Sequence, residues 1–410
     1  MIIAGEASGD MLAAELVQAL RQEFANAKPV HTTDLQPLRT TLEPRFFGAG
    51  GPGMAAAGVE LAVDMTRHSV VGLFEVIKNY FTFKQIFHQL FRLALERQPD
   101  VIICVDFGGF NRRFAHTIRQ FVRQRAGWFH DWRPKIVQYV SPQVWASRES
   151  RAYQIAEDYD LVLSIFPFEK EWYAKRVPRL PVVFVGHPIL DRYGKSNRPA
   201  RASGTSQTLL FLPGSRPGEL SRHIPVMLDT WAILRRVLPN LNARMALPTE
   251  ALVQQAKELG VPDSIKVQFG GLAEALSQAD ISIASTGTVT MECALFGVPT
   301  VALYKTFWGN FLIAKNIVKV KYLAMPNILA GEEIFPEFIQ HAAAGDAIAQ
   351  ATLELFRDDN RRAKIKAKLS EIIGSLGEPG ANVRAAKAVM QLLNSQDATI
   401  QSYPAFLHSC

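Results

Sequence analysis

The sequence predicts an α/β fold with two domains, each built on a parallel sheet that helices cover. Short apolar segments that favour buried strands alternate with longer segments of helical periodicity along the chain of 410 residues. The strand segments are apolar on both faces, which is typical of parallel sheets. A stretch rich in Gly, Ser, Pro and Arg, residues 194–207, separates two such halves and indicates a linker. We therefore expect an N-terminal domain over residues 1–195 and a C-terminal domain over residues 205–410.

The N-terminal half begins with a strand over Met1–Ala4, which leads into a glycine loop, Gly5–Asp10, and a helix through Leu20. Further buried strands of this half are predicted at residues 101–105, 135–140 and 161–165. The C-terminal half repeats the pattern, with strands at residues 209–212, 281–284 and 300–303. Ligands bind at the carboxyl ends of such strands, so we expect the functional residues there, around a cleft between two facing sheets.

The composition excludes several classes of protein. Hydrophobic residues make up 48% of the chain, which is enough for two large cores. Cys104, Cys293 and Cys410 form neither a paired framework nor a metal spacing, so we expect a reducing compartment. Met1 runs directly into a strand, and no stretch of about 18 uncharged apolar residues occurs. We therefore expect neither a secretory signal nor a transmembrane helix.

The formal net charge of +7 is distributed unevenly. Residues 112–135 contain seven Arg or Lys against one acid, Asp131, and residues 305–321 contain four Lys and no acid. Two interpretations remain open: solvated faces, or surfaces that attract anionic lipid headgroups or phosphorylated substrates. No recognised nucleic-acid module occurs, so nucleic acid is not an expected partner.

Residues 70–95 carry a wide, aromatic-rich apolar stripe at helical spacing, interspersed with Lys78, Lys84 and Arg92. One interpretation is a buried pair of core helices. The other is an interfacial segment that rests in a membrane surface or holds acyl chains. The sequence leaves both open.

Two loops of the C-terminal half predict an anion site. Pro213-Gly214-Ser215-Arg216 and, about 70 residues later, Ser285-Thr286-Gly287-Thr288 each enter a predicted helix, where free backbone N–H groups and the positive helix end attract an anion. Arg216 adds a planar donor suited to phosphate. Glu292, one helical turn into its helix, is placed to accept hydrogen bonds from a ribose. The loops therefore predict a nucleotide diphosphate site and an enzyme that uses a nucleotide-activated donor.

Other loops extend this pattern along the chain. Phe47–Met54 is a second glycine loop, and Val105–Asn111 places the carboxylate of Asp106 at a strand end. Further polar segments follow in order: Tyr139–Ala146, Pro167–Lys170, Val185–Pro188 and Met325–Gly331. Each motif alone is weak evidence. Taken in this order and spacing, they resemble the lipid-A-disaccharide synthase family over roughly residues 1–390.

The resemblance implies a GT-B-type glycosyltransferase with two Rossmann-like domains. It implies a reaction that joins UDP-2,3-diacylglucosamine to 2,3-diacylglucosamine 1-phosphate, forms a β-1,6-linked disaccharide and releases UDP. It further implies a cytoplasmic protein that associates peripherally with the inner membrane and uses no metal and no cofactor. A homodimer is allowed, and the final helices are then expected to cross back or to exchange between protomers.

An inverting transfer needs a base for the attacking hydroxyl and stabilisation of the departing diphosphate. We predict Asp106 as the base, because it ends a strand at the cleft and matches the family's catalytic acid. The alternative is that Asp106 caps the following turn together with Asn111. Glu6 and Asp10 are rival carboxylates, whose other roles are to organise the first loop or to bind acceptor hydroxyls.

On the donor side, Arg216 is predicted to neutralise charge on the leaving UDP, with a surface salt bridge as the alternative. The loop Ser285–Thr288 is predicted to donate to the diphosphate, although it also fits an ordinary helix N-cap. Glu292 is predicted to accept from the ribose, against a solvated helix acid. Asn327 is predicted to contact the donor phosphate or sugar.

Three further residues are assigned near the first sheet. Ser141 and Trp145 are predicted to shape the acceptor side, and His187 is expected to be structural rather than catalytic. Three positions depart from the family pattern and affect the local geometry: Gln138 stands where a His is usual, Ser147 where a Trp is usual, and Gly108 where a Pro is usual.

Two competing functions remain. A UDP-sugar epimerase, or another GT-B transferase with a water-soluble acceptor, would share the C-terminal loops but would not need the stripe of residues 70–95. A non-catalytic nucleotide-sugar-binding relative would be indicated by the loss of Asp106, Arg216 or Glu292. All three residues are present.

Overall fold

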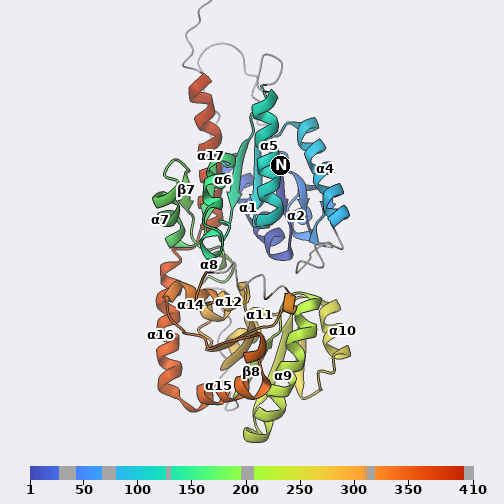
Figure 1. Cartoon of the computed structure of the whole chain (residues 1–410), viewed down its shortest axis with the longest axis vertical. Helices are drawn as coiled ribbons and strands as arrows, with labels where there is room; N and C mark the ends of the chain where they lie inside the picture. The colour runs from blue at the N-terminus through green and yellow to red at the C-terminus, as the bar shows by residue number, and fades with distance from the viewer. Residues whose placement is uncertain are drawn as a thin grey trace, which may run out of the picture. The chain divides into compact units, whose positions relative to one another are not determined.

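The computed structural model describes residues 1–26, 43–66, 80–125, 131–194, 207–309, 311 and 319–400, which form two compact units. Unit 1 contains the described residues before Arg192 and those after Leu376, and unit 2 contains those from Arg192 to Leu376. The end of the chain therefore belongs to the first unit. Figure 1 shows this segment as the red helix α17 (Ala381–Ile400).

Unit 1 is built on a parallel sheet of seven strands in the order β3-β2-β1-β4-β5-β6-β7. The strands are β1 (Ile2–Ala4), β2 (Phe47–Gly50), β3 (Glu60–Asp64), β4 (Val101–Val105), β5 (Lys135–Tyr139), β6 (Leu161–Ser164) and β7 (Val182–Phe184). Its helices include α1 (Ala7–Asn26), α2 (Pro52–Ala56), α4 (Tyr80–Arg97), α5 (Gly108–Arg125), α6 (Arg151–Asp158), α7 (Pro167–Arg176) and α8 (Ile189–Arg192). The apolar segments that predicted parallel strands coincide with β1, β4, β5 and β6.

Successive residues of the central strands point to opposite helix layers, as the pleat requires. Cys104 of β4 shares a buried core with Leu90 of α4 and Phe114 of α5. On the other face, the hydroxyl of Tyr139 in β5 donates to Asn382 Oδ1 of α17 at 2.8 Å. Asp191 caps α17, because its carboxylate accepts the backbone N–H groups of Ala381 and Asn382 at 3.2 and 3.1 Å.

Part of the aromatic stripe is helix α4, while residues 70–79 lie outside the described residues. Ile86 and Leu90 are buried, whereas Phe81 is 75% exposed. Phe87 meets Phe110 of α5 edge-on, with ring centroids 5.6 Å apart. One side of α4 is therefore core. Among the described residues, no helix combines the length and the apolar character needed to cross a bilayer.

Unit 2 is built on a parallel sheet of six strands in the order β10-β9-β8-β11-β12-β13. The strands are β8 (Thr208–Leu212), β9 (Asn242–Leu247), β10 (Ile265–Phe269), β11 (Ile281–Ser285), β12 (Thr300–Tyr304) and β13 (Glu337–Ile339). Its helices include α9 (Pro217–Val237), α10 (Glu250–Glu258), α11 (Leu272–Gln278), α12 (Thr288–Leu295), α14 (Met325–Ala330), α15 (Gly345–Arg357) and α16 (Asp359–Ser375).

Each sheet reverses its strand order at one point, between β1 and β4 in unit 1 and between β8 and β11 in unit 2. In open α/β sheets, ligands bind outside the carboxyl ends of the strands at such a switch point. The first switch point is flanked by the Gly5–Asp10 loop and by Asp106. The second is flanked by the loops at residues 213–216 and 285–288.

Candidate active site

The first switch point brings the glycine loop after β1 against Asp106 after β4. A Cβ added to Gly9 would lie 4.0 Å from Asp106 Cβ and 3.8 Å from the Val105 carbonyl oxygen. A Cβ added to Gly5 would overlap the Phe107 ring. Only glycine permits this close approach at position 5. The two strand ends therefore form one compact edge.

Asp106 lies in a turn of unusual backbone conformation. Asp106 and Phe107 have φ angles of 47° and 49°, and Val140, after the neighbouring strand β5, has a φ of 65°. This left-handed region costs a non-glycine residue about 1–3 kcal/mol, and it is least favourable for a β-branched residue such as Val140. Strain of this kind persists only where the surrounding structure fixes it, and it is frequent at functional sites.

Two buried amides hold this turn. Asn111 Nδ2 donates to the carbonyl oxygen of Asp106 at 2.9 Å and to that of Val105 at 3.2 Å. Gln138 Nε2 donates to the Val140 carbonyl at 3.1 Å and to the Asp106 carbonyl at 3.4 Å. Within the described residues, the side-chain oxygens of both amides are buried without a hydrogen-bond partner. Asn111 therefore supports the main chain of Asp106, and Gln138 is the second anchor.

The two rival carboxylates have different surroundings. Asp10 is buried, and its carboxylate accepts the N–H groups of Gly51 at 2.7 Å, Gly53 at 2.8 Å and Met54 at 3.0 Å. It therefore joins the first glycine loop to the second, which is the organising role that the sequence allowed. Glu6 is half-buried in the first loop, and its carbonyl oxygen accepts the Asp10 N–H at 2.7 Å.

Ser141 and Trp145 belong to a buried cluster around Glu169, whose role the sequence did not reveal. Trp145 Nε1 donates to Glu169 Oε1 at 3.0 Å, and Ser141 Oγ donates to the Tyr173 hydroxyl at 3.3 Å. Burial raises the pKa of Glu169 to about 7, and the hydrogen bond from Trp145 opposes part of this rise. Ser141 and Trp145 are only 3% and 8% exposed, so they support the edge of the sheet as buried residues rather than as part of its surface.

In the first anion loop of unit 2, residues 213–216, the hydrogen-bond donors are directed at the side chain of Glu219. Gly214 has a φ of 127°, which favours glycine, and Arg216 stands immediately before α9. Glu219 accepts the Ser215 N–H at 3.0 Å and a hydrogen bond from Arg216 Nη1 at 3.3 Å. A carboxylate of the chain itself thus accepts hydrogen bonds from the donors of this loop.

The second anion loop presents fewer donors than the sequence suggested. Ser285 is buried as the last residue of β11, and the Thr286 N–H donates to the Leu303 carbonyl at 3.1 Å. Gly287 and Thr288 are exposed at the start of α12, and a Cβ at Gly287 would meet nothing within 4 Å. The exposed end of the loop is therefore Gly287–Thr288.

Glu292 is half-buried and has a neighbour that the sequence analysis missed. The Tyr193 hydroxyl donates to Glu292 Oε1 at 3.2 Å. Burial raises the pKa of Glu292, and the charge of Arg192 opposes the rise. Burial also raises the pKa of Tyr193 to about 12, so its hydroxyl keeps its proton and donates. Tyr193 thus orients the carboxylate.

His223, also missed, ties the first anion loop to β12. The Lys305 N–H donates to His223 Nε2 at 3.0 Å, so Nδ1 carries the proton and donates to the Pro213 carbonyl at 2.6 Å. Burial lowers the pKa of this imidazole. The neutral ring therefore fixes the position of the loop that contains Arg216.

Asn327 has a structural environment. It is completely buried, and its Oδ1 accepts the N–H groups of Ile334 and Phe335 at 2.9 and 2.8 Å. Its Nδ2 donates to the Phe335 carbonyl at 2.7 Å and to Glu337 Oε1 at 2.8 Å, which leaves no exposed amide for a donor substrate. His187 is also buried, and its Nδ1 accepts the Ile189 N–H at 3.2 Å.

Comparison with known proteins identifies the relatives of this chain. The family model described as lipid-A-disaccharide synthetase matches residues 1–392. The lipid-A-disaccharide synthase of Trichlorobacter lovleyi is 34% identical over 403 residues, covering 96% of this chain and 97% of the relative. That of Geobacter metallireducens is 34% identical over 405 residues, covering 97% of each.

Solved structures of low sequence identity share the fold. The S. aureus MnaA–UDP co-structure has a TM-score of 0.59 at 14% identity, covering 96% of each chain. The calicheamicin glycosyltransferase CalG4 has a TM-score of 0.57 at 14% identity, covering 96% of this chain and 98% of that one. The predicted family and the GT-B fold class are confirmed. The chain belongs to the lipid-A-disaccharide synthetase family and is a GT-B glycosyltransferase of lipid A biosynthesis.

Proposed function

We propose that this enzyme transfers 2,3-diacylglucosamine from its UDP ester to the 6-hydroxyl of 2,3-diacylglucosamine 1-phosphate, with inversion at the anomeric carbon. The products are the β-1,6-linked disaccharide 1-phosphate and UDP. The observation that carries the proposal is that each switch point of the fold holds one half of the required chemistry. A carboxylate on a fixed turn stands at the first, and loops suited to an anion stand at the second.

On the acceptor side, Asp106 is proposed as the general base. It accepts the proton of the 6-hydroxyl while that oxygen forms a bond to the donor's anomeric carbon. The bond from that carbon to the β-phosphate oxygen breaks, and its electron pair leaves with UDP. The amides of Asn111 and Gln138 support this role because they hold the Asp106 main chain from two directions.

On the donor side, Arg216, Gly287 and Thr288 are proposed to bind the diphosphate and to stabilise the charge that develops on it. The diphosphate would replace the Glu219 carboxylate as the acceptor for Arg216 and for the Ser215 N–H. Glu292, oriented by Tyr193, is proposed to accept from a ribose hydroxyl. The UDP named in the MnaA co-structure, a protein of this fold, supports a uridine nucleotide here.

The proposal also concerns the cellular setting. Both proposed substrates carry acyl chains, so we propose that the enzyme works at the cytoplasmic face of the inner membrane. The 75% exposed ring of Phe81 on α4 supports an apolar contact with acyl chains or lipid. The proposal needs no metal and no cofactor, and a homodimer remains a prediction from the family.

The test is UDP release by the purified protein in neutral detergent, measured with the donor alone and with the donor plus the acceptor. Release that depends on the acceptor, together with the disaccharide mass, is the expected result. Arg216→Ala should weaken UDP binding, whereas Glu258→Gln, on the exposed face of α10, should leave it unchanged. Normal UDP binding without acceptor-dependent release would contradict the proposed reaction.

A further inference from the structure

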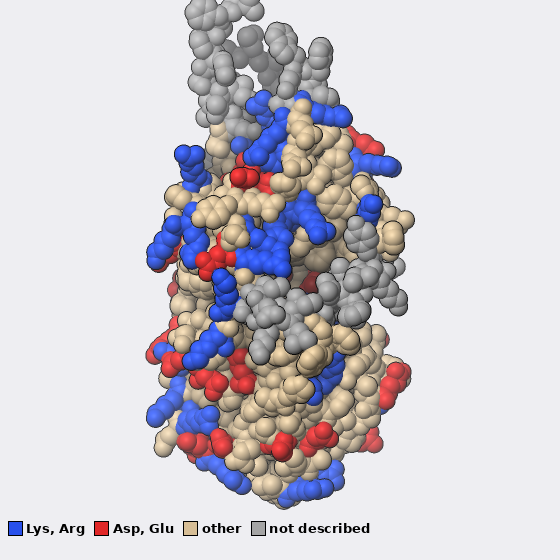
Figure 2. Space-filling model, in the orientation of Figure 1, with Lys and Arg blue, Asp and Glu red and all other residues tan. Residues whose placement is uncertain are grey.

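Four arginines gather near the carboxyl edge of the unit 1 sheet; we call them the arginine cluster. Arg112 and Arg113 stand in the first turns of α5, which follows β4. Arg148 and Arg151 stand at the start of α6, which follows β5, and the Arg151 N–H donates to the Arg148 carbonyl at 3.0 Å. α5 packs against α6. Figure 2 shows basic side chains gathered where Figure 1 draws the lower ends of these helices.

The members of the cluster lower one another's pKa, which indicates that their guanidinium groups lie close together. Burial lowers the pKa of Arg112, the positive charges of Arg113 and Arg148 lower it further, and the negative charge of Asp158 opposes part of this fall. Burial also lowers the pKa of Arg151, followed by the charges of Arg112 and Arg148. In the described part of the chain, no ion pair or hydrogen bond joins these four guanidinium groups to an acid. Glu149, which lies between Arg148 and Arg151 in the sequence, pairs instead with Arg176 at 3.0 Å.

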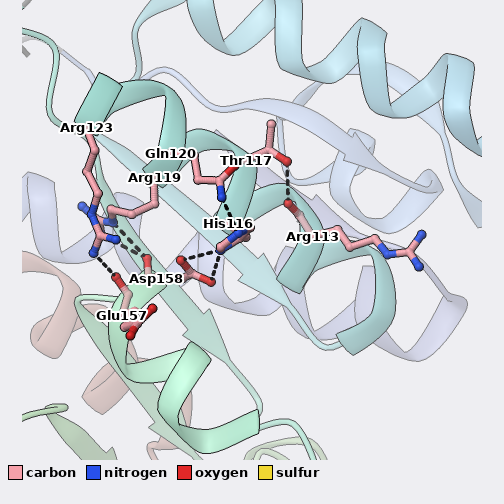
Figure 3. A network of polar contacts seen from close by, with 8 residues as sticks. All are labelled: Arg113, His116, Thr117, Arg119, Gln120, Arg123, Glu157 and Asp158. Atoms are coloured by element: carbon pink, nitrogen blue, oxygen red, sulfur yellow. Dashed lines mark hydrogen bonds and ion pairs between the residues drawn. The ribbon is translucent and has the colours of Figure 1, made fainter. Parts of the chain in front are cut away.

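Other arginines of the same helix have a different environment, which Figure 3 shows. Arg119 and Arg123 donate to the carbonyl oxygens of Asp158 and Glu157, at 3.1 and 3.0 Å. Arg119 also pairs with the carboxylate of Asp160 at 2.6 Å. The carboxylate of the neighbouring Asp158 interacts with His116, with Nδ1 and Oδ2 3.0 Å apart. Arg113, by contrast, points away from this network. The later arginines of α5 therefore stabilise the contact with α6, whereas the cluster places like charges together, which disfavours folding.

We propose that the arginine cluster binds the anomeric phosphate of the acceptor, a sugar 1-phosphate dianion. This inference rests on the proposed function and identifies a substrate-binding site for it. Guanidinium groups match phosphate oxygens in pairs, and a dianion relieves the repulsion between the arginines. The start of α5 adds its positive helix end.

The position of the cluster suits such an acceptor. Gly108 begins α5 two residues after Asp106, and four residues at about 1.5 Å each place Arg112 about 6 Å further along the helix. In the acceptor, the hydroxymethyl group and the anomeric phosphate are attached on either side of the ring oxygen. A base for the first and cations for the second must therefore lie about one sugar ring apart.

The test uses the double variant Arg113→Gln/Arg148→Gln, because both side chains are exposed and lack a partner in the described residues. Turnover is measured in neutral detergent with the acceptor and with its analogue that lacks the 1-phosphate. We expect kcat/KM for the phosphorylated acceptor to fall about 100-fold or more, since each charge-assisted contact contributes about 10- to 100-fold. For the dephosphorylated analogue, kcat/KM should stay unchanged.

The matched control is Arg123→Gln, on the same helix but outside the cluster, which should behave as wild type with both acceptors. An equal loss of kcat/KM on both acceptors in the double variant, or no loss at all, would overturn the inference. Binding to phosphatidylglycerol vesicles is measured in parallel by sedimentation. If the double variant lost vesicle binding but still discriminated between the acceptors as wild type does, the cluster would bind lipid headgroups instead.

Failure of the proposed function would look different. Wild-type protein would then release no UDP with either acceptor. In that case, calorimetric binding of glucosamine 1-phosphate, compared with glucosamine, tests the cluster by itself. Binding that requires the phosphate, is lost in the double variant and is kept in Arg123→Gln would support the inference. Equal binding by wild type and the double variant would refute it.

Discussion

Replacing Glu169 with Gln is expected to remove a pH dependence of stability from unit 1. The Glu169 side chain is 1% exposed and accepts hydrogen bonds from Trp145 at 3.0 Å and from the Phe166 N–H at 3.4 Å. Burial raises its pKa from 4.5 to about 7. Between these values the folded protein keeps a proton that the unfolded chain has lost. Stability from this group is therefore present at low pH and lost as the pH rises toward 7.

The size of the effect follows from the raised pKa. A rise from 4.5 to about 7 corresponds to about 3 kcal/mol, because each tenfold change in proton affinity is worth about 1.4 kcal/mol. Most of this loss of stability occurs between pH 5 and pH 8. The side chain in the Glu169→Gln variant cannot ionise, so the variant should not lose this stability. Any cost of placing the new amide against the Phe166 N–H is the same at both pH values and cancels in the comparison.

The assay is urea unfolding at pH 5 and pH 8, followed by tryptophan fluorescence. Relative to wild type, the Glu169→Gln variant should gain about 2–3 kcal/mol between pH 5 and pH 8. The control Glu258→Gln, on the exposed face of α10, should follow wild type. If the difference between Glu169→Gln and wild type were the same at both pH values, the reasoning from burial would be refuted.

Asp106, Val140 and His223 can each be tested by a single substitution. Asp106→Asn should keep UDP binding, measured by calorimetry, but lower turnover by about 10²–10⁴-fold, and normal turnover would exclude the proposed base. Val140→Gly should leave the free energy of unfolding in urea nearly unchanged, because glycine adopts a φ of 65° without strain. Val137→Gly, in buried β5, should lower it by about 3 kcal/mol. Equal losses of stability in the two variants would contradict backbone strain at Val140. Burial lowers the pKa of His223, so below about pH 6.5 the unfolded chain binds a proton that the folded protein does not bind. The free energy of unfolding therefore decreases as the pH is lowered. His223→Gln should show a smaller drop in Tm from pH 7 to pH 5 than wild type, and an equal drop would count against a neutral folded imidazole.

The fold and the positions of the strand ends could be predicted because parallel strands leave a strong local signal. The segment over residues 101–105 is apolar on both faces, so it indicates a buried strand, and Asp106 must then lie at its carboxyl end. The loops at residues 213–216 and 285–288 were located in the same way, since each follows such a strand. Parallel topology then brings these ends to one edge of each sheet.

The residues that the sequence did not reveal act through partners far away in the chain. His223 bonds to Lys305, 82 positions later, and Tyr193 bonds to Glu292, 99 positions later. Local pattern cannot pair such residues, because the contact exists only once the sheet has formed. Asn327 shows the converse case. A polar residue in a conspicuous loop motif suggested a ligand contact, whereas its amide is used by the backbone of residues 334–335.

The departures from the family pattern near Asp106 are explained by what these positions must supply. Position 138 faces the carbonyl oxygens of Asp106 and Val140, so it requires an N–H donor. The amide of Gln138 provides one, and the imidazole of a histidine would also provide one. Gly108 is the first residue of α5, where proline is favoured, and a Cβ there would meet Pro142 at an ordinary 3.7 Å. Both substitutions therefore preserve the geometry around Asp106, which is why its proposed role as the base is compatible with an altered motif.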